Sequence, residues 1–402
     1  MRIGIVLLLL GTLLSCKSQS PTGHAAMAMQ PIVGAAQTEI YVPLLAGKRV
    51  GIVANQTSVV GQTHLVDTLL SMRVQVVKVF APEHGFRGDA GAGEHIADGK
   101  DAKTGLPLIS LYGKNKKPTA DMLSDVDVLL FDIQDVGARF YTYISTMHYV
   151  MEAASENNKE LIILDRPNPN GHFVDGPVLE APFKSFVGMH PIPIVHGLTI
   201  GELAQMIIGE KWISLSDQST SLVTVIPCKN YDHRTRYKLP IRPSPNLSSA
   251  RAIYLYPSLC WFEGTVVSVG RGTALPFEVI GFPGNTKGNY TFTPRDIAHV
   301  ASDPPHENVL CTGYDLSQLD IDSLEKATII NVQWLIDMYQ GYSGEKPFFQ
   351  SPDFFDKLCG TASIRKMVLA GASADSVRAS WSADLVEYKK KRKHYLLYPD
   401  FE

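Results

Sequence analysis

Short apolar segments alternate with longer segments of helical periodicity in the amino-terminal half of the chain. Four segments have the apolar, β-branched composition of buried strands, at residues 49–55, 75–81, 127–132 and 160–165. Helical patterns cover residues 64–72 and 143–157. Another helix is expected near Thr199, whose hydroxyl can form a capping box with Glu202. Because parallel strands need crossovers of this length, the pattern predicts an α/β fold with a doubly wound parallel sheet.

Polar residues follow each predicted strand directly. They are Asn55-Gln56-Thr57, Glu83-His84-Gly85, residues 132–135 and Asp165-Arg166-Pro167-Asn168. Ligands bind at the carboxyl ends of the strands in open α/β sheets, so four strand ends would converge on one crevice. The alternative is that these loops only cap helices and form turns.

Several common chemistries lack their signatures in this chain. The first strand is not followed by a GxGxxG turn, and neither GxxxxGK[ST], GxSxG nor HExxH occurs. We therefore expect no nucleotide site and no cofactor. Four cysteines besides Cys16 are widely spaced without a CxxC pair, so zinc is not expected. A net charge of −3 argues against nucleic-acid binding.

Carboxylates are the strongest remaining catalytic candidates. Glu83 ends an apolar strand, where partial burial would favour the protonated form that a general acid needs. Asp132 and Asp135, three residues apart, could both face the crevice and orient a water or stabilise positive charge on a sugar ring. Asp132 could equally be a structural partner of Arg139. His84 could assist proton movement or simply complete a turn.

The first residues have the features of a targeting segment. Arg2 precedes a short apolar run, and Leu13-Leu14-Ser15-Cys16 resembles a lipobox. The run is shorter than the roughly 20 residues of a membrane-spanning helix, so we expect a cleaved signal at residues 1–15 and a lipid anchor on Cys16. Residues 16–37 are small and polar and are interpreted as a tether. The expected location is the periplasm, at the outer membrane, with either face of that membrane left open.

The remaining chain is long enough for two domains, predicted at residues 38–243 and 244–402. The second is expected to be a smaller α+β domain, with strands near residues 252–256 and 265–269 and a helix across 331–339. The basic run at residues 389–393 is interpreted as the solvated face of a final helix or strand. Neither oligomeric state nor disulfide pairing follows from the sequence.

Several longer motifs, in order along nearly the whole chain, resemble the NamZ-type exo-β-N-acetylmuramidases. They are APEHGFRG at residues 81–88, DIQDVGARFYTY at 132–143, DRPNP at 165–169, GP at 176–177, HGLT at 196–199, GE at 201–202, SPNL at 244–247, EGT at 263–265, SVGRGT at 268–273 and PFE at 276–278. The resemblance implies a Rossmann-like first domain, a smaller second domain, and an active cleft between them. It also implies hydrolysis of the β-1,4 bond after a terminal N-acetylmuramic acid (MurNAc) of peptidoglycan fragments, without metal or nucleotide.

Within that resemblance, roles follow from chemistry. Glu83 is the proposed general acid, with Asp132 or Asp135 as its partner and His84 as a possible aid to proton movement. A retaining, an inverting and a substrate-assisted route all stay open, the last using the 2-acetamido group of MurNAc. The predicted substrate-binding residues are Asn55, Arg87, Arg139, Tyr143, Arg166, His196, Glu263 and Arg271.

The arginines among them are candidates for the lactyl carboxylate of MurNAc, because guanidinium groups bind carboxylates bidentately. Arg271 is favoured because glycines flank it. Each arginine could instead pair with a structural carboxylate. Two other functions are considered: a periplasmic sugar-binding lipoprotein without catalysis, and a cell-wall esterase or amidase using Ser58 or Ser268.

Overall fold

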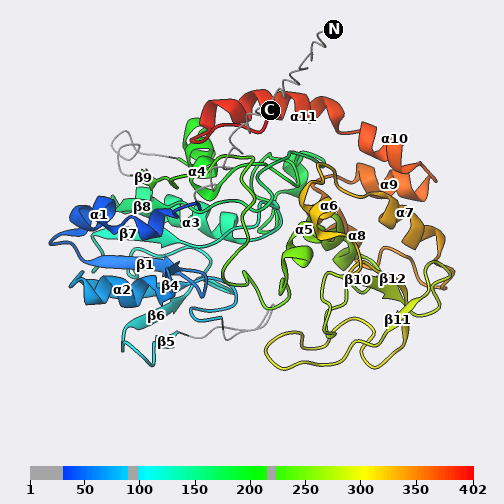
Figure 1. The fold of residues 1–402 in the computed structure, drawn as a ribbon, viewed down its shortest axis with the longest axis horizontal. Coiled ribbons are helices and arrows are strands. Elements are labelled where there is room, and N and C mark those ends of the chain that lie inside the picture. The colour runs from blue at the N-terminus through cyan, green and yellow to red at the C-terminus, as the bar shows by residue number, and fades with distance from the viewer. Residues whose placement is uncertain (1–29, 89–97, 215–222) are drawn as a thin grey trace, which may run out of the picture. The chain divides into compact units, whose positions relative to one another are not determined.

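A seven-stranded sheet organises the amino-terminal half of the structure, a computed structural model (Figure 1). The strand order is β5-β6-β4-β1-β7-β8-β9, and every neighbouring pair is parallel except β5 with β6. The strands are β1 (Val50–Ala54), β4 (Val76–Ala81), β5 (Gly99–Lys100), β6 (Pro107–Ser110), β7 (Val128–Asp132), β8 (Glu160–Leu164) and β9 (Val223–Ile226). The four predicted strands are confirmed to within a residue at each end, and so is the doubly wound fold.

The structure describes residues 30–88, 98–214 and 223–402. The predicted signal segment at residues 1–15, the lipid-modified Cys16 and the tether as far as residue 29 lie outside the described residues. Contacts join Pro31–Glu402 into one unit, so the domain boundary expected at residue 244 stays a prediction.

The predicted tether extends too far at its carboxyl end. Residues 31–37 pack on the sheet domain, because Ile32 exchanges backbone hydrogen bonds with Lys229, and Gln37 Nε2 donates to the carbonyl of Pro227 at 2.6 Å. Ala35 is fully buried. Residues 31–37 are mostly apolar, unlike the polar residues before them, and the partners that order them lie about 190 residues away in sequence.

Side chains of the central strands alternate between two cores, one on each face of the sheet. In β7, Val128 and Leu130 face the core that includes α1 and α2, whereas Leu129 and Phe131 face the core that includes α3 and α4. The helices are α1 (Thr38–Tyr41), α2 (Leu65–Ser71), α3 (Tyr143–Glu156) and α4 (Ile200–Gly209). Short elements are β2 (Val59–Val60), β3 (Thr63–His64) and the 3-10 helices η1 (Gly34–Ala36), η2 (Val42–Leu45) and η3 (Ala181–Phe183).

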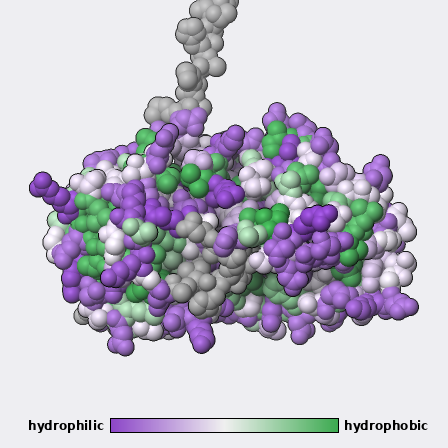
Figure 2. Space-filling model, turned by 90° about the horizontal axis from the view of Figure 1, so that it is seen from below, coloured by the Kyte–Doolittle hydropathy of each residue, from purple (hydrophilic) through white to green (hydrophobic). Residues whose placement is uncertain are grey.

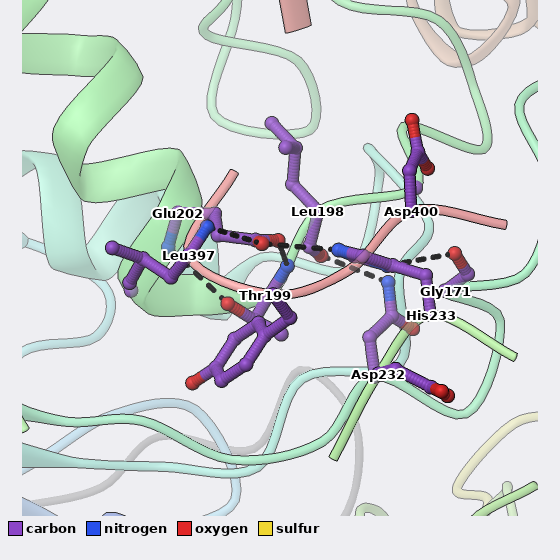
Figure 3. A network of polar contacts seen from close by, with 12 residues as sticks. Gly171, Leu198, Thr199, Glu202, Asp232, His233, Leu397 and Asp400 are labelled. Carbon is purple, nitrogen blue, oxygen red and sulfur yellow. Dashed lines mark hydrogen bonds and ion pairs between the residues drawn. The ribbon is translucent and has the colours of Figure 1, made fainter. Parts of the chain in front are cut away.

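The predicted capping box of α4 is confirmed and extends into a buried network (Figure 3). Thr199 Oγ1 accepts from the backbone N–H of Glu202 at 3.2 Å, and the Glu202 carboxylate accepts from the N–H of Thr199 at 2.8 Å. The other carboxylate oxygen of Glu202 accepts from Leu397 N at 2.9 Å and lies 3.0 Å from His233 Nε2. A helix start thus holds the carboxyl-terminal segment in place.

The second half of the chain contains a three-stranded antiparallel sheet and a series of short helices. The strands follow the order β10-β12-β11. Their bounds are β10 (Val279–Phe282), β11 (Tyr290–Phe292) and β12 (Cys311–Asp315). The helices are α5 (Ala250–Leu259), η5 (Cys260–Gly264), α6 (Ile321–Glu325), α7 (Gln333–Gln340), α8 (Pro352–Cys359), α9 (Ser363–Leu369), α10 (Ala374–Ala379), α11 (Ser382–Arg392) and η6 (Lys393–Tyr395).

Two strands predicted in this half are wrong. Residues 252–256 belong to α5, whose start is capped by Ser249 Oγ accepting from Ala252 N at 3.0 Å. Residues 265–269 form no strand and contribute a single bridge between Ser268 and Gly281. The β-branched and aromatic side chains of α5 suggested a strand, but they fill the core of a helix instead. The helix predicted at residues 331–339 is confirmed as α7.

The carboxyl end of the chain returns to the amino-terminal half. The Tyr388 hydroxyl donates to the carbonyl of His196 at 2.7 Å, and the Tyr398 hydroxyl donates to the carboxylate of Asp165. The basic run is a solvated helical face at its lysines, which are at most partly buried. Arg392 is the exception: it is fully buried and pairs with Asp400 at 2.8 Å.

Hydrophilic residues dominate the face of the molecule in Figure 2, with apolar residues in small separate patches. No helix within residues 30–88, 98–214 and 223–402 has both the length and the apolar character required to cross a membrane.

Candidate active site

A cavity of about 690 Å³ is lined by both halves of the chain. Its wall combines residues that follow β4 and β6, residues that precede α3, and residues from α5 and the loops beyond it. This volume is typical of sites that bind small molecules. Five predicted site residues line it, namely Glu83, His84, Tyr143, Glu263 and Arg271.

Glu83 lies at the carboxyl end of β4, where the sheet topology brings it to the cavity wall. Its side chain is partly exposed. Thr142 Oγ1 donates to Glu83 Oε2 at 3.0 Å, and the Tyr143 hydroxyl donates to the Glu83 backbone carbonyl at 3.3 Å. The Tyr112 hydroxyl is also hydrogen-bonded to the carboxylate; burial and then the charge of Glu83 raise the pKa of Tyr112 to about 12. Three hydroxyl groups from two segments of the chain, Tyr112 after β6 and Thr142-Tyr143 at the start of α3, therefore orient this acid.

His84 adopts a left-handed backbone conformation, with φ of 70°. Such a conformation costs a β-substituted residue roughly 1–2 kcal/mol, and Gly85 follows it with φ of 79°. The two residues turn the chain sharply after Glu83. His84 is buried and lines the cavity, so both of its predicted roles, in proton movement and in the turn, remain compatible with its position.

An aromatic wall supports the cavity. The rings of Tyr141 and Tyr143 meet edge to face at 4.8 Å, and Tyr256 continues the contact to Phe277 at 5.0 Å. Tyr141 donates to the carbonyl of Pro243 at 2.8 Å. These contacts fix the segment before α5 against the start of α3, so the two halves of the wall hold their relative positions.

Glu263 and Arg271, which both line the cavity, form an ion pair in the carboxyl-terminal half of the chain. Arg271 Nη2 lies 2.6 Å and Nε 2.9 Å from Glu263 Oε1, and the guanidinium lies 5.2 Å from the ring centroid of Phe277. The neighbouring Glu263 charge raises the pKa of Arg271 against the opposing effect of burial. Arg271 lines the cavity as predicted, but its charge is already compensated.

Asp132 does not line the cavity. Both of its carboxylate oxygens accept from Arg166, at 2.6 and 2.9 Å, and neither side chain is more than 3% exposed. Arg166 also donates to the carbonyl of Val59 at 3.1 Å. The structure corrects the predicted placement of both residues at the cavity, because they form a buried ion pair with each other at the carboxyl ends of β7 and β8.

Two further arginines are also engaged away from the cavity. Arg87 forms a bidentate pair with Asp101, both contacts being 2.8 Å. Arg139 is fully buried and donates to four backbone carbonyls, those of Pro177, Ile192, Leu358 and Cys359. Neither residue lines the cavity, so this geometry lends no support to their predicted role in substrate binding. The predicted partnership of Asp132 with Arg139 is also wrong.

Asp135 and His196 lie together in the interior behind the aromatic wall. His196 Nε2 is 3.7 Å from Asp135 Oδ2, which accepts from Gly137 N at 2.7 Å. Burial raises the pKa of Asp135 to about 7 and lowers the pKa of His196 to about 3. Neither residue lines the cavity, so their placement at the substrate is likewise corrected.

Asn55 serves the turn after β1 rather than the cavity. Its side-chain oxygen accepts from Thr57 N at 2.9 Å and from Thr57 Oγ1 at 2.6 Å, and its backbone carbonyl lies 2.9 Å from His64 Nε2. The alternative interpretation of polar loops as turns therefore holds at this strand end.

The wall residues that the sequence analysis did not select as site residues include Tyr112, Lys116, Thr142 and Tyr256. Tyr112 and Lys116 follow β6, a short strand beginning with Pro107 that was not predicted. Recognising that strand would have added its polar loop to the converging strand ends. In the described parts of the chain, no group of three or more His, Cys, Asp or Glu side chains is arranged to hold a metal ion.

A curated Bacillus subtilis (strain 168) protein named Peptidoglycan beta-N-acetylmuramidase NamZ is 40% identical over 98% of this chain and 97% of its own length. A crystal structure of a DUF1343 family protein from Bacteroides fragilis NCTC 9343 is 50% identical, with a TM-score of 0.84, covering 92% of this chain and all of that one. A second DUF1343 protein from that organism is 30% identical, with a TM-score of 0.78, over 92% of this chain and 99% of that one.

Family descriptions agree with these relatives. Residues 50–251 match the amino-terminal part of the family described as Exo-beta-N-acetylmuramidase NamZ, and residues 254–398 match its carboxyl-terminal part. The resemblance inferred from the motifs is confirmed, and the chain belongs to the exo-beta-N-acetylmuramidase NamZ family.

Proposed function

We propose that this chain is a glycoside hydrolase that releases MurNAc from the non-reducing end of peptidoglycan fragments, in cell-wall turnover or recycling. Family membership and the named activity of the Bacillus subtilis relative support this function. The structural observation that carries it is the Glu83 carboxylate, held at the cavity wall by the hydroxyl of Thr142.

Glu83 would act as the general acid. It would donate a proton to the glycosidic oxygen while the bond from that oxygen to the anomeric carbon breaks and an oxocarbenium-like sugar forms. Water finally supplies the hydroxyl on the anomeric carbon and returns a proton to the site. Three hydroxyl groups from Tyr112, Thr142 and Tyr143 hold the Glu83 segment ready for this step.

The partner of Glu83 determines the stereochemical course. Asp132 and Asp135 are held away from the cavity, and within the described part of the wall the other carboxylate is Glu263, which is paired with Arg271. This arrangement favours the substrate-assisted route, in which the 2-acetamido oxygen of MurNAc attacks its own anomeric carbon. Replacing the acetyl group by trifluoroacetyl should then slow turnover strongly; an unchanged rate would exclude this route.

The central test uses the disaccharide MurNAc-GlcNAc. The purified protein and Glu83→Gln are each incubated with it, and released sugars are followed by mass spectrometry. We expect free MurNAc from the wild type and a loss of about 10²- to 10⁴-fold in Glu83→Gln, which still binds the disaccharide. Binding without release by the wild type would instead support a sugar-binding protein. Release of an acyl or amide substituent would support a cell-wall esterase or amidase.

The sequence of residues 2–16 supports an exported and lipid-anchored protein. The apolar run and the lipobox-like Leu13-Leu14-Ser15-Cys16 favour export, cleavage after Ser15 and a lipid anchor on Cys16 in the periplasm. Radiolabelled palmitate should be incorporated into the expressed full chain and not into Cys16→Ala. Equal labelling of both proteins would contradict the anchor.

A further inference from the structure

A site that selects MurNAc must recognise its lactyl ether, because GlcNAc differs from MurNAc only in lacking that group. The lactyl group ends in a carboxylate, so recognition calls for a cation that is not already neutralised by the protein. This inference rests on the proposed function. The cation of the described cavity wall that has no carboxylate partner is therefore the best candidate to bind this group.

Besides His84, the basic side chains of the described wall are Arg271 and Lys116. Arg271 forms two short contacts with Glu263 Oε1. A carboxylate approaching Arg271 would have to compete with Glu263 or lie next to it. Arg271 therefore offers little net attraction to an anionic ligand.

Lys116 differs from Arg271 in its partners. Its ammonium nitrogen lies 4.3 Å from the centroid of the Phe186 ring, which also lines the cavity. No carboxylate forms an ion pair with Lys116 in the part of the chain that the structure describes. An aromatic face orients an ammonium group while leaving its charge uncompensated.

The adjacent residue shows that this state is specific to position 116. Lys117 lies 2.6 Å from Glu156 and 3.3 Å from Glu152, and does not line the cavity. Lys117 is therefore paired with carboxylates of α3, whereas Lys116 lines the cavity without a carboxylate partner among the described residues. The loop after β6 also carries Tyr112, which contacts Glu83, so Lys116 and the acid belong to one connected wall.

We propose that Lys116 binds the lactyl carboxylate of MurNAc and is the residue that distinguishes this sugar from GlcNAc. Phe186 orients its ammonium group toward the cavity side of the wall, and Arg271 with Glu263 forms a neutral part of the same wall. A substrate whose lactyl carboxyl is amidated, as when a stem peptide is attached, would lose this ion pair and depend less on Lys116.

The test compares two disaccharides, MurNAc-GlcNAc with a free lactyl carboxylate and the same compound as its lactyl methylamide. Lys116→Met removes the charge and keeps much of the apolar stem. We expect it to lower kcat/KM for the free acid by about 10- to 100-fold, mainly through KM, and to change kcat/KM for the methylamide by less than about threefold. Lys116→Arg should recover most of the loss.

Lys117→Met is the matched control and should leave both substrates within about twofold of the wild type. Equal losses on the acid and the methylamide, or no loss on the acid, would overturn the role of Lys116. If the wild type cleaves neither disaccharide, the proposed function fails first. If the wild type cleaves both disaccharides equally well and Lys116→Met cleaves them at the wild-type rates, the proposed function stands and only the role of Lys116 is excluded.

Discussion

The hydroxyl of Thr142 lies 3.0 Å from Oε2 of Glu83 and joins the residue before α3 to the second residue after β4. The two positions are 59 residues apart in sequence and meet because β4 ends and α3 begins at the same edge of the sheet. The proposed acid therefore takes its orientation from the fold itself.

Thr142→Val should impair the chemical step more than substrate binding. The substitution keeps the shape of the side chain and removes the hydroxyl that orients the Glu83 carboxyl group, so kcat should fall about 10- to 100-fold with KM within about threefold. Steady-state kinetics on MurNAc-GlcNAc measure this split. Thr146→Val, one helical turn away, removes a hydroxyl that donates to a backbone carbonyl at 3.4 Å and serves as the control. Similar losses in both variants would contradict a specific role for Thr142.

Asp132→Asn should destabilise the protein rather than abolish its chemistry. The change leaves the buried Arg166 guanidinium without its charge partner, which typically costs about 3–5 kcal/mol. Urea unfolding would measure this loss, and the folded variant should keep a kcat close to that of the wild type. Asp127→Asn breaks a partly exposed pair with Arg49 and should cost much less. A stable Asp132→Asn protein with a strongly reduced kcat would return Asp132 to the list of catalytic candidates.

Arg139→Lys tests whether a conservative charge is sufficient in the interior. Lysine cannot reach four carbonyls with one ammonium group, whereas the planar guanidinium donates to all four. We expect a loss of about 2–4 kcal/mol in the free energy of unfolding, with KM unchanged. Arg365→Lys, at a partly exposed pair with Asp356, is the control. A raised KM with unchanged stability would instead indicate a substrate contact.

The sequence predicts the parallel sheet well because its signal is local. Each central strand carries its own run of apolar residues, and burial on both faces leaves no alternation to misinterpret. The prediction at residues 252–256 is wrong because it also relies on local side-chain preference. Ile253 and Tyr256 are typical of strands, whereas the cap by Ser249 that starts α5 is a weaker signal.

The site is harder to predict because the hydrogen-bond and ion-pair partners of each polar side chain determine whether that side chain can face a ligand. Glu83 can be selected from its position at a strand end, but nothing near Arg139 in sequence reveals carbonyls at Leu358 and Cys359, about 220 residues away. The same applies to Arg166, which is bound to Asp132 34 residues earlier. An arginine or aspartate becomes available to a ligand only when the fold leaves it unpaired, and that depends on tertiary contacts.

Asp135 gives the protein a pH dependence of predictable sign. Burial raises its pKa in the folded state to about 7, from the ordinary value of 3.8 that applies to the unfolded chain. Between these values the folded protein retains a proton that the unfolded chain releases, so stability from this group is complete below about pH 4, declines as the pH rises, and is lost above about pH 7. Asp135→Asn is neutral in both states and lacks this dependence.

The difference in unfolding free energy between the wild type and Asp135→Asn should therefore shift in favour of the variant from about pH 4 to about pH 8, by at most about 4 kcal/mol. Urea unfolding of both proteins across this range measures it. His196, whose pKa is lowered to about 3, titrates with the opposite sign, but it is present in both proteins and largely cancels in the difference. Parallel stability curves for the two proteins would mean that Asp135 is ionised in the folded state. Such a buried charge would then need a compensating group at its second oxygen, which has no hydrogen-bond partner among the described residues.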